Sequence, residues 1–215
     1  MPWLWLIAGP NGSGKSTLAR GLIAKGFPAI VDKTGPPSTV WINPDDVFAE
    51  LAADPAASRD KPEDEIALAA ARIADERVLT SIDDGISVVR ETVLSTDRFK
   101  PIVDMAIGRG FQFGLIFVSL ASPEECVQRI ELRTTLGGHG VPPERTRARW
   151  ARSIGNLPWF ADRAEIVLVY DNSALASPVL LYEKKDGIWT THRVRLIPEI
   201  DAALAPIVTV RRRGP

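Results

Sequence analysis

Apolar runs alternate with segments of helical pattern along most of this chain. The runs rich in apolar residues cover about residues 3–8, 40–42, 86–92, 111–120 and 166–170. Such runs predict strands buried on both faces, as in a parallel sheet. Helices are predicted over about residues 16–25, 45–53, 62–80, 97–108, 122–135 and 144–154. The alternation predicts an α/β fold, with a mostly parallel sheet that carries helices on both faces.

Local signals place the ends of several helices. Gly26 suits the C′ position after the first helix. Asp45 or Asp46 is expected to cap the second helix, with Asp46 favoured as the purely structural cap. Ser122 is followed by Pro123 and two acidic residues, which is typical of a helix start.

The last part of the chain has a different pattern. Two apolar segments, at about residues 179–183 and 188–194, flank an Asp-Gly pair and predict a C-terminal β-hairpin. A short helix is expected at about residues 198–205. We find no repeat or interdomain linker and predict a single domain over residues 1–215, with a C-terminal extension at about 174–215.

Composition narrows the class of protein. The chain has 215 residues, of which 45% are hydrophobic and 25% charged, and a formal net charge of −1. These values are ordinary for a globular domain and provide no general attraction for nucleic acid or a membrane surface. One cysteine and the absence of a signal-peptide pattern or a long apolar stretch lead us to expect a cytoplasmic protein.

A glycine-rich turn follows the first apolar run. Residues 9–16 match the pattern G-x-x-x-x-G-K-[ST] at every fixed position. Glycines allow successive backbone N–H groups to form an anion-binding concavity, and the helix that follows adds the positive end of its dipole. The motif therefore predicts ATP binding, with Lys15 reaching the phosphates and Ser16 holding Mg²⁺. We assign the nucleotide site to Gly9, Pro10, Asn11, Gly12, Ser13, Gly14, Lys15, Ser16 and Thr17.

Polar clusters follow the other predicted strands. They lie at residues 43–46, 91–95 and 171–173. Because ligands bind beyond the carboxyl ends of parallel strands, these clusters are expected to meet the glycine-rich turn at one edge of the sheet.

Five segments in order carry a family resemblance. They are residues 9–17, Asn43-Pro44-Asp45, the run Arg90-Glu91-Thr92-Val93-Leu94-Ser95, Arg133 with Gly137-Gly138-His139 and Val141-Pro142, and residues 147–157. Together they resemble the zeta-toxin family of P-loop kinases, and more narrowly the small zeta-toxin-like ATPases of bacteria. The resemblance implies a P-loop NTPase/kinase fold and a kinase that phosphorylates a small molecule. It also raises an antitoxin protein as a partner.

The resemblance assigns the catalytic aspartate to Asp45. A carboxylate at a strand end can orient and deprotonate an acceptor hydroxyl. The alternative is that Asp45 only caps a helix. Glu91, with Thr92 beside it, is a candidate for binding the acceptor substrate, as the matching glutamate does in the family; the alternative for Glu91 is an ion pair with an arginine.

Arginines are concentrated between residues 129 and 152. Six of them, against two acids, lie on two helices joined by a glycine-rich break, and we interpret residues 129–157 as an arginine-rich helical lid. A guanidinium at the transferring phosphoryl group would stabilise the transition state. We favour Arg133 and Arg149 for this role, place Arg129 and Asn172 at the nucleotide, and leave His139 open between phosphate contact and turn capping. The stripe at residues 146, 150, 154 and 157 is interpreted as core.

Two departures from the pattern stand out. The longest predicted strand ends without an aspartate, so Mg²⁺ is expected on Ser16 with Asp45 or Asp171 as further candidates. The chain is also shorter than the larger toxins, which puts in doubt the nucleotide sugar that the family implies, such as UDP-N-acetylglucosamine, as acceptor. A kinase for another small acceptor and a non-catalytic ATP-binding regulator are the alternative hypotheses.

Overall fold

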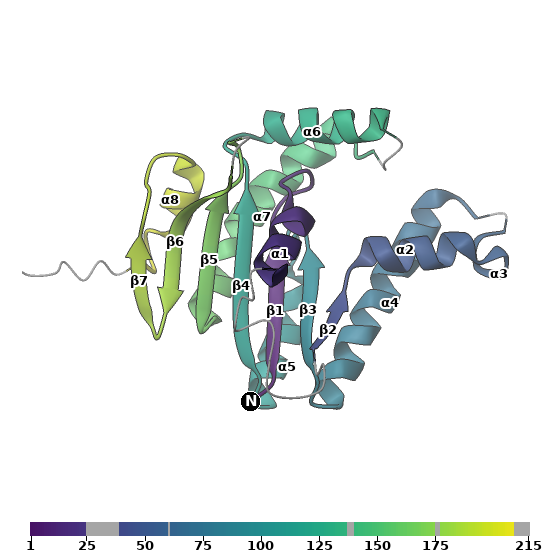
Figure 1. The fold of residues 1–215 in the computed structure, drawn as a ribbon, viewed down its shortest axis with the longest axis horizontal. Coiled ribbons are helices and arrows are strands. Elements are labelled where there is room, and N and C mark those ends of the chain that lie inside the picture. Colours follow the sequence, from purple (N-terminus) through teal and green to yellow (C-terminus); the bar gives the residue numbers. More distant parts are fainter. Residues whose placement is uncertain (25–38, 60, 137–139, 175–176, 209–215) are drawn as a thin grey trace, which may run out of the picture.

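The computed structural model describes residues 1–24, 39–59, 61–136, 140–174 and 177–208. Its strands form one sheet in the order β2-β3-β1-β4-β5-β6-β7 (Figure 1). The five strands from β2 to β5 in this order are parallel, and β6 and β7 are antiparallel additions at one edge. The strand bounds are β1 Trp3–Ala8, β2 Thr39–Ile42, β3 Ser87–Thr92, β4 Gln112–Ser119, β5 Ile166–Asp171, β6 Val179–Lys185 and β7 Ile188–Thr191.

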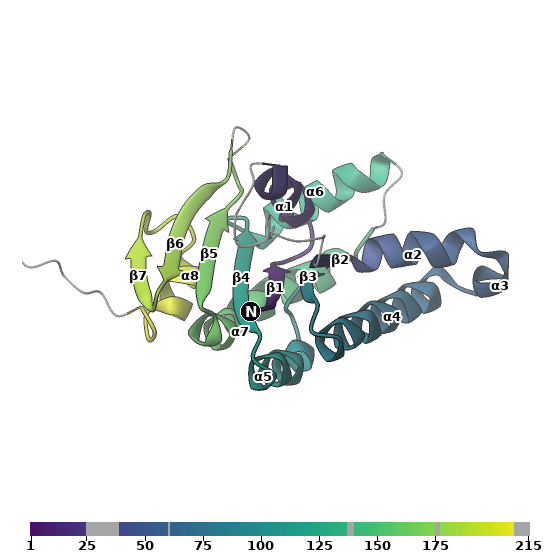
Figure 2. The same ribbon diagram turned by 60° about the horizontal axis from the view of Figure 1, so that its bottom comes forward.

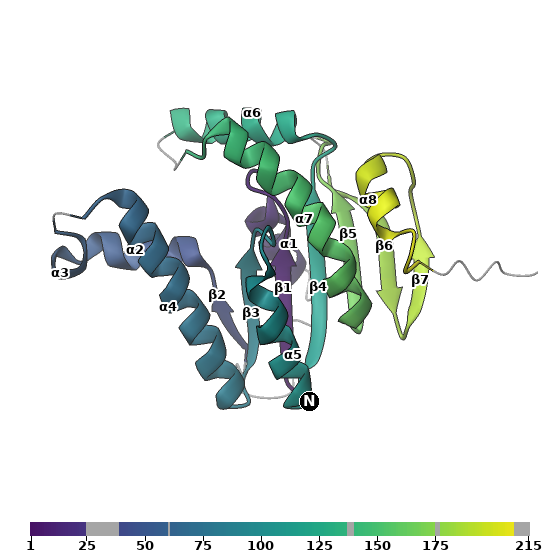
Figure 3. The same cartoon turned by 180° about the vertical axis from the view of Figure 1, so that it is seen from behind.

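Helices cover both faces of the sheet unequally. Helix α1 lies on one face, and α4, α5, α7 and α8 lie on the other (Figures 2 and 3). The helix bounds are α1 Lys15–Ala24, α2 Pro44–Ala53, α3 Pro55–Ser58, α4 Glu63–Asp83, the 3-10 helix η1 Asp97–Phe99, α5 Lys100–Gly108, α6 Pro123–Thr135, α7 Pro143–Arg163 and α8 Pro198–Leu204. This is the α/β arrangement of a P-loop NTPase, as the alternation of strands and helices predicts. None of the helices within the described ranges has the length and apolar character to cross a membrane.

The apolar runs became the buried strands. Residues 4–8 of β1 and 113–118 of β4 are fully or almost fully buried, except that Gly114 contributes no side chain. Alternate residues of these strands pack into separate clusters on the two faces of the sheet. The hairpin also forms as predicted, and Asp186 and Gly187 in its turn both have positive φ, as a type I′ turn requires.

The cap of α2 was predicted wrongly. Asn43, not Asp45 or Asp46, is the N-cap: its Oδ1 accepts a hydrogen bond from the Asp45 backbone N–H at 3.0 Å, and Pro44 takes the first helical position. Asn followed by Pro is a standard helix start, so this cap could have been recognised from the sequence. Asp45 is therefore not needed to cap the helix.

Helix α7 is longer than its pattern predicted. It continues through Pro158 to Arg163, although proline inside a helix costs about 3 kcal/mol or more. The stripe of Thr146, Trp150, Ile154 and Leu157 is buried as expected, and Phe160 and Ala161 extend it. Burying a large side chain stabilises by about 1.5–3 kcal/mol, so continued packing against the sheet offsets the proline.

Candidate functional site

The loop between β1 and α1 has a backbone that only glycine suits at several positions. Gly9 has φ +139°, and a Cβ there would lie 1.9 Å from the Val118 carbonyl oxygen. Gly14 has φ +85°, and its Cβ would lie 2.3 Å from Asn172 Nδ2. These two glycines of the pattern are thus required by close packing of the loop against β4 and the residue that follows β5.

Asn172, directly after β5, holds the loop, and Arg129 of α6 holds Asn172. Asn172 Nδ2 donates to the Ser13 carbonyl at 2.8 Å, and Arg129 Nη2 donates to the Asn172 carbonyl at 2.7 Å. Both residues were assigned to nucleotide binding. Arg129 does line the cavity above the loop, whereas Asn172 supports the loop backbone.

The side chain of Lys15 folds back onto the loop and contacts its backbone. Its Nζ donates to the Pro10 carbonyl oxygen at 2.9 Å. Burial of the ammonium lowers the pKa of Lys15 to about 8, although the carboxylates of Glu91 and Asp45 oppose this shift. A lysine whose charge is poorly solvated gains from an anion placed beside it.

A cavity of about 370 Å³ opens over the loop, and we call it the first cavity. It brings together most of the residues predicted for the site. Its lining consists of Asn11, Gly12, Gly14, Lys15, Ser16, Thr17, Asn43, Pro44, Asp45, Glu91, Thr92, Val93, Arg129 and Arg133. Gly9, Pro10 and Ser13 belong to the loop but are buried, and they shape its backbone without lining the cavity.

Glu91 contacts the P-loop directly. Its Oε2 accepts a hydrogen bond from Ser16 Oγ at 2.7 Å, and its Oε1 accepts one from Asn43 Nδ2 at 3.3 Å. Burial raises the pKa of the Glu91 carboxyl, while the hydrogen bond from Ser16 and the charge of Lys15 lower it. The alternative of an arginine ion pair for Glu91 finds no such pair among the ion pairs of the described residues.

The oxygen atoms at Ser16 fit a magnesium ion. A hydroxyl and a carboxylate 2.7 Å apart offer the hard ligands that Mg²⁺ takes, with water and phosphate completing its shell. In many P-loop ATPases this carboxylate is expected at the end of the strand that corresponds to β4. Here β3, the other neighbour of β1, carries it. Asp171, the other candidate for a magnesium ligand, has a structural contact instead: its Oδ1 accepts hydrogen bonds from the backbone N–H and the hydroxyl of Ser173.

Asp45 lies on the wall of two neighbouring cavities. The second cavity has a volume of about 540 Å³ and shares Asn11, Pro44, Asp45 and Arg133 with the first. Its remaining lining is Phe48, Glu63, Asp64, Ala67, Gly140, Val141, Pro142, Arg145 and Arg149. Phe48, Glu63 and Asp64 were not predicted to belong to the site, because residues of α2 and α4 reach this wall only through the packing of those two helices.

The predicted lid arginines separate into distinct places. Arg149 Nη1 donates to Asn11 Oδ1 at 3.1 Å, which joins α7 to the P-loop. Arg145 lines the second cavity, whereas Arg152 lines a different one beside residues 95–97. Burial lowers the pKa of Arg149, and the charges of Arg145 and Arg152 lower it further. Gly137, Gly138 and His139 lie outside the described residues.

Helix α7 also holds the segments that directly follow β4 and β3. Trp150 Nε1 donates to the Leu120 carbonyl at 3.2 Å from the buried side of the helix. Ser153 Oγ donates to the Val93 carbonyl, and Asn156 Nδ2 donates to the Leu94 carbonyl at 3.0 Å. The helix that carries Arg149 is therefore part of the core.

The chain is similar to one known protein family. Residues 4–157 match the model of the AAA_33 family, described as an AAA domain. The chain belongs to this AAA domain family. Its matched region runs from β1 to the middle of α7 and contains both cavities, while the hairpin and α8 lie outside it. Among curated protein sequences, none matches the chain.

Solved structures share the fold at low sequence identity. The native AvrRxo1-ORF1:-ORF2 complex has a chain with a TM-score of 0.70 and 17% identity, and the match covers 93% of our AAA domain chain and 63% of that one. A structure of the PezAT chromosomal toxin-antitoxin system of Streptococcus pneumoniae has a TM-score of 0.58 and 17% identity, covering 85% and 72%. A putative kinase from Chloroflexus aurantiacus J-10-fl has a TM-score of 0.51 and 21% identity, covering 69% and 76%. The AAA domain chain thus spans less than two thirds of the AvrRxo1 complex chain that it resembles.

Proposed function

We propose that this protein is a Mg²⁺-dependent kinase that transfers the γ-phosphoryl group of ATP to a hydroxyl of a small molecule. The observation that carries the proposal is the position of Asp45 on the wall shared by the two cavities. A donor over the P-loop and an acceptor in the second cavity would meet at this carboxylate. Asp45 is exposed and is not needed as the cap of its helix, because Asn43 is the cap, and this supports a chemical role.

The transfer follows from these positions. Asp45 accepts the proton of the acceptor hydroxyl as the hydroxyl oxygen forms its bond to the γ-phosphorus. The bond between the γ-phosphorus and the bridging oxygen breaks, and ADP leaves with its negative charge. Lys15 and the P-loop N–H groups neutralise the phosphates, and the guanidinium groups of Arg133 and Arg149 stabilise the charge on the transferring group.

Magnesium would be held by Ser16, with Glu91 beside it. When bound, the ion neutralises phosphate charge and orients the donor. Glu91 keeps the Ser16 hydroxyl directed through the 2.7 Å hydrogen bond. Thr92 lines the first cavity next to Glu91, and both residues remain candidates for contact with the acceptor.

The family resemblance suggests a nucleotide sugar such as UDP-N-acetylglucosamine as the acceptor. Phe48 and the arginines of the second cavity are compatible with a ring and a phosphate group. An antitoxin protein is proposed as a partner because the similar PezAT structure belongs to a toxin-antitoxin system. A cytoplasmic location, with no nucleic-acid or membrane partner, also stays a proposal.

The alternative is an ATP-binding regulator without an acceptor. Arg133 lines both cavities and Arg149 lies at the loop, which favours the kinase, since binding alone requires no positive charge between a donor and an acceptor. A kinase for a nucleoside, an antibiotic or a polynucleotide end would use the same site.

The test is acceptor discovery by mass spectrometry. Cell extract is incubated with the protein and ATP, and metabolites that gain a phosphoryl group are sought; a panel of nucleotide sugars, sugars and nucleosides is run beside it. Asp45→Asn is expected to abolish the product, as is Lys15→Ala. Asp46→Asn is the matched control, because Asp46 is exposed on the same helical turn and lines neither cavity.

Two results would count against the proposal. Full acceptor-dependent phosphorylation by Asp45→Asn would remove Asp45 as the base. ATP binding by the wild type without any phosphorylated product would favour the regulator.

A further inference from the structure

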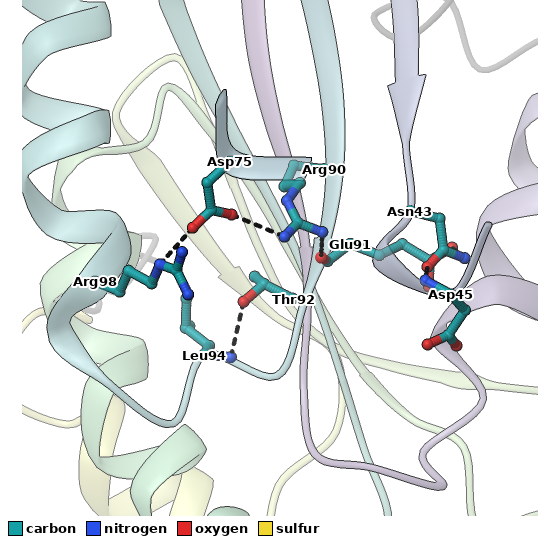
Figure 4. Close-up of polar contacts among 8 residues, drawn as sticks. All are labelled: Asn43, Asp45, Asp75, Arg90, Glu91, Thr92, Leu94 and Arg98. Carbon is teal, nitrogen blue, oxygen red and sulfur yellow. Dashed lines mark hydrogen bonds and ion pairs between the residues drawn. The ribbon is translucent and has the colours of Figure 1, made fainter. Parts of the chain in front are cut away.

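A buried ion pair lies directly behind the P-loop site. Arg90 of β3 donates through Nη2 to Asp75 Oδ1 of α4 at 2.8 Å, and the two side chains are only 3% and 9% exposed. The guanidinium also lies 5.5 Å from the centre of the Phe99 ring. Arg98 approaches the other carboxylate oxygen of Asp75 from the surface, as Figure 4 shows.

The same guanidinium reaches the residue that contacts Ser16. Arg90 Nη1 donates to the backbone carbonyl of Glu91 at 2.7 Å. Successive residues of a strand point to opposite faces, so Arg90 faces α4 while Glu91 faces α1. The pairing of β2 with β3 stops at Ile42 opposite Arg90. After Arg90, β3 has no further backbone pairing with β2. There, Asn43 contacts the Glu91 carboxylate and Arg90 contacts the Glu91 carbonyl.

Stability alone is a poor reason for such a pair. Burying two charges costs several kcal/mol for each ion, and replacing a buried pair by apolar residues is often neutral or stabilising. Moreover, Arg90 Nε is buried without a hydrogen-bond partner among the described residues. An apolar pair would suit this part of the core better.

The placement of Glu91 is a better reason for the buried pair of Arg90 and Asp75. Glu91 presents one oxygen to Ser16 and the other to Asn43, over 2.7 and 3.3 Å. A shift of the strand end by 1 Å would break the first contact, and misplacements of about that size can cost a hundredfold in rate. A planar guanidinium that holds Asp75 and a carbonyl at once fixes the strand end in a way that a single ammonium cannot.

We propose that Arg90, held by Asp75, is a positioning residue that sets the direction in which Glu91 presents its carboxylate to Ser16 and the magnesium site. This inference rests on the proposed binding of Mg²⁺ and ATP, and not on the identity of the acceptor. It gives a role to Asp75 and Arg90, which lie behind the site and line neither cavity.

The test measures how much Mg²⁺ strengthens ATP binding. Calorimetry is run with the full chain in excess EDTA and in Mg²⁺, and the ratio of the two ATP dissociation constants is compared among variants. In the double variant Arg90→Met with Asp75→Leu, we expect the ratio to fall about tenfold or more, as when groups that orient metal ligands are removed. Thermal unfolding of this variant is expected to stay near that of the wild type.

Two further variants make the result specific. Arg90→Lys keeps a charge pair with Asp75 but cannot also hold the Glu91 carbonyl, so its ratio should fall as well; it decides the question if the double variant does not fold. Arg77→Gln with Glu50→Gln removes an exposed pair that joins α4 to α2 and should leave the ratio unchanged. A normal ratio in Arg90→Lys and the double variant would overturn the proposal. If Mg²⁺ strengthens ATP binding to the wild type but the wild type phosphorylates no acceptor, that result would count against the kinase and not against the role of Arg90.

Discussion

Arg149 of α7 donates a hydrogen bond to Asn11 of the P-loop at 3.1 Å, although 138 residues separate them in the chain. Asn11 is one of the variable positions of the motif, so the contact belongs to this chain's own arrangement. It places a guanidinium on the wall of the second cavity, beside Asn11, which lines both cavities. The helix that carries it is anchored in the core by Trp150 and Leu157.

Removing this guanidinium should affect rate more than ATP binding. Arg149→Ala is expected to lower kcat by about a hundred- to a thousandfold, because the charge acts on the transferring group. Arg152→Ala on the same helix should stay within about threefold, since Arg152 lines another cavity. Steady-state kinetics with the identified acceptor measures both, and equal effects of the two substitutions would contradict the assignment.

Gly14 should tolerate no side chain. Gly14→Ala forces a residue with φ +85° and a Cβ 2.3 Å from Asn172 Nδ2, so the loop must shift. We expect ATP affinity to fall by at least about tenfold, because a left-handed backbone alone costs roughly 1–2 kcal/mol.

Gly21 provides the matched control for Gly14. It lies in α1, and a Cβ there meets nothing within 4 Å. Gly21→Ala should leave ATP affinity unchanged and stabilise the fold by roughly 0.5–1 kcal/mol. Calorimetry and thermal unfolding separate the two outcomes, and a Gly14→Ala protein with normal affinity would show that the loop adapts.

The pH dependence of nucleotide binding should report on Lys15. Burial lowers the pKa of Lys15 to about 8 in the protein without nucleotide. The side chain is therefore a charged ammonium below pH 8 and a neutral amine above it. Because phosphates bind the charged form, ADP affinity in EDTA should be highest below pH 8 and weaken by about tenfold for each pH unit above it. Lys15→Met should bind weakly at every pH, and an identical pH profile in this variant would assign the effect to another group.

Cys126 should not react with thiol reagents while the protein is folded. It is fully buried, and burial raises the pKa of its thiol to about 12. Reaction with iodoacetamide at pH 8 is therefore expected only after opening of the structure, at a rate that falls when ATP stabilises the fold. Rapid labelling of the native protein, equal to that in denaturant, would contradict the packing of α6 against the P-loop.

Most of the fold could be predicted from local patterns. The continuous apolar strands, the Ser122 cap and the Asp-Gly hairpin each depend on residues close in sequence, and all three formed as expected. Two helix ends were predicted wrongly: the Asn43 cap was overlooked, although its signal is local, and α7 was ended before Pro158. The second error arose because burial of Phe160, a tertiary effect, outweighs the proline.

The sequence by itself determined the phosphate-binding loop, because a glycine backbone followed by Lys15 and Ser16 is a property of neighbouring residues. It also placed Asp45 and Glu91 at strand ends. Only the tertiary structure decided that Glu91 meets Ser16, that Asp45 stands between two cavities, and that Arg90 lies behind them. Those relations depend on the strand order β2-β3-β1 and on the packing of α2 and α4, which bring together side chains that local pattern cannot relate.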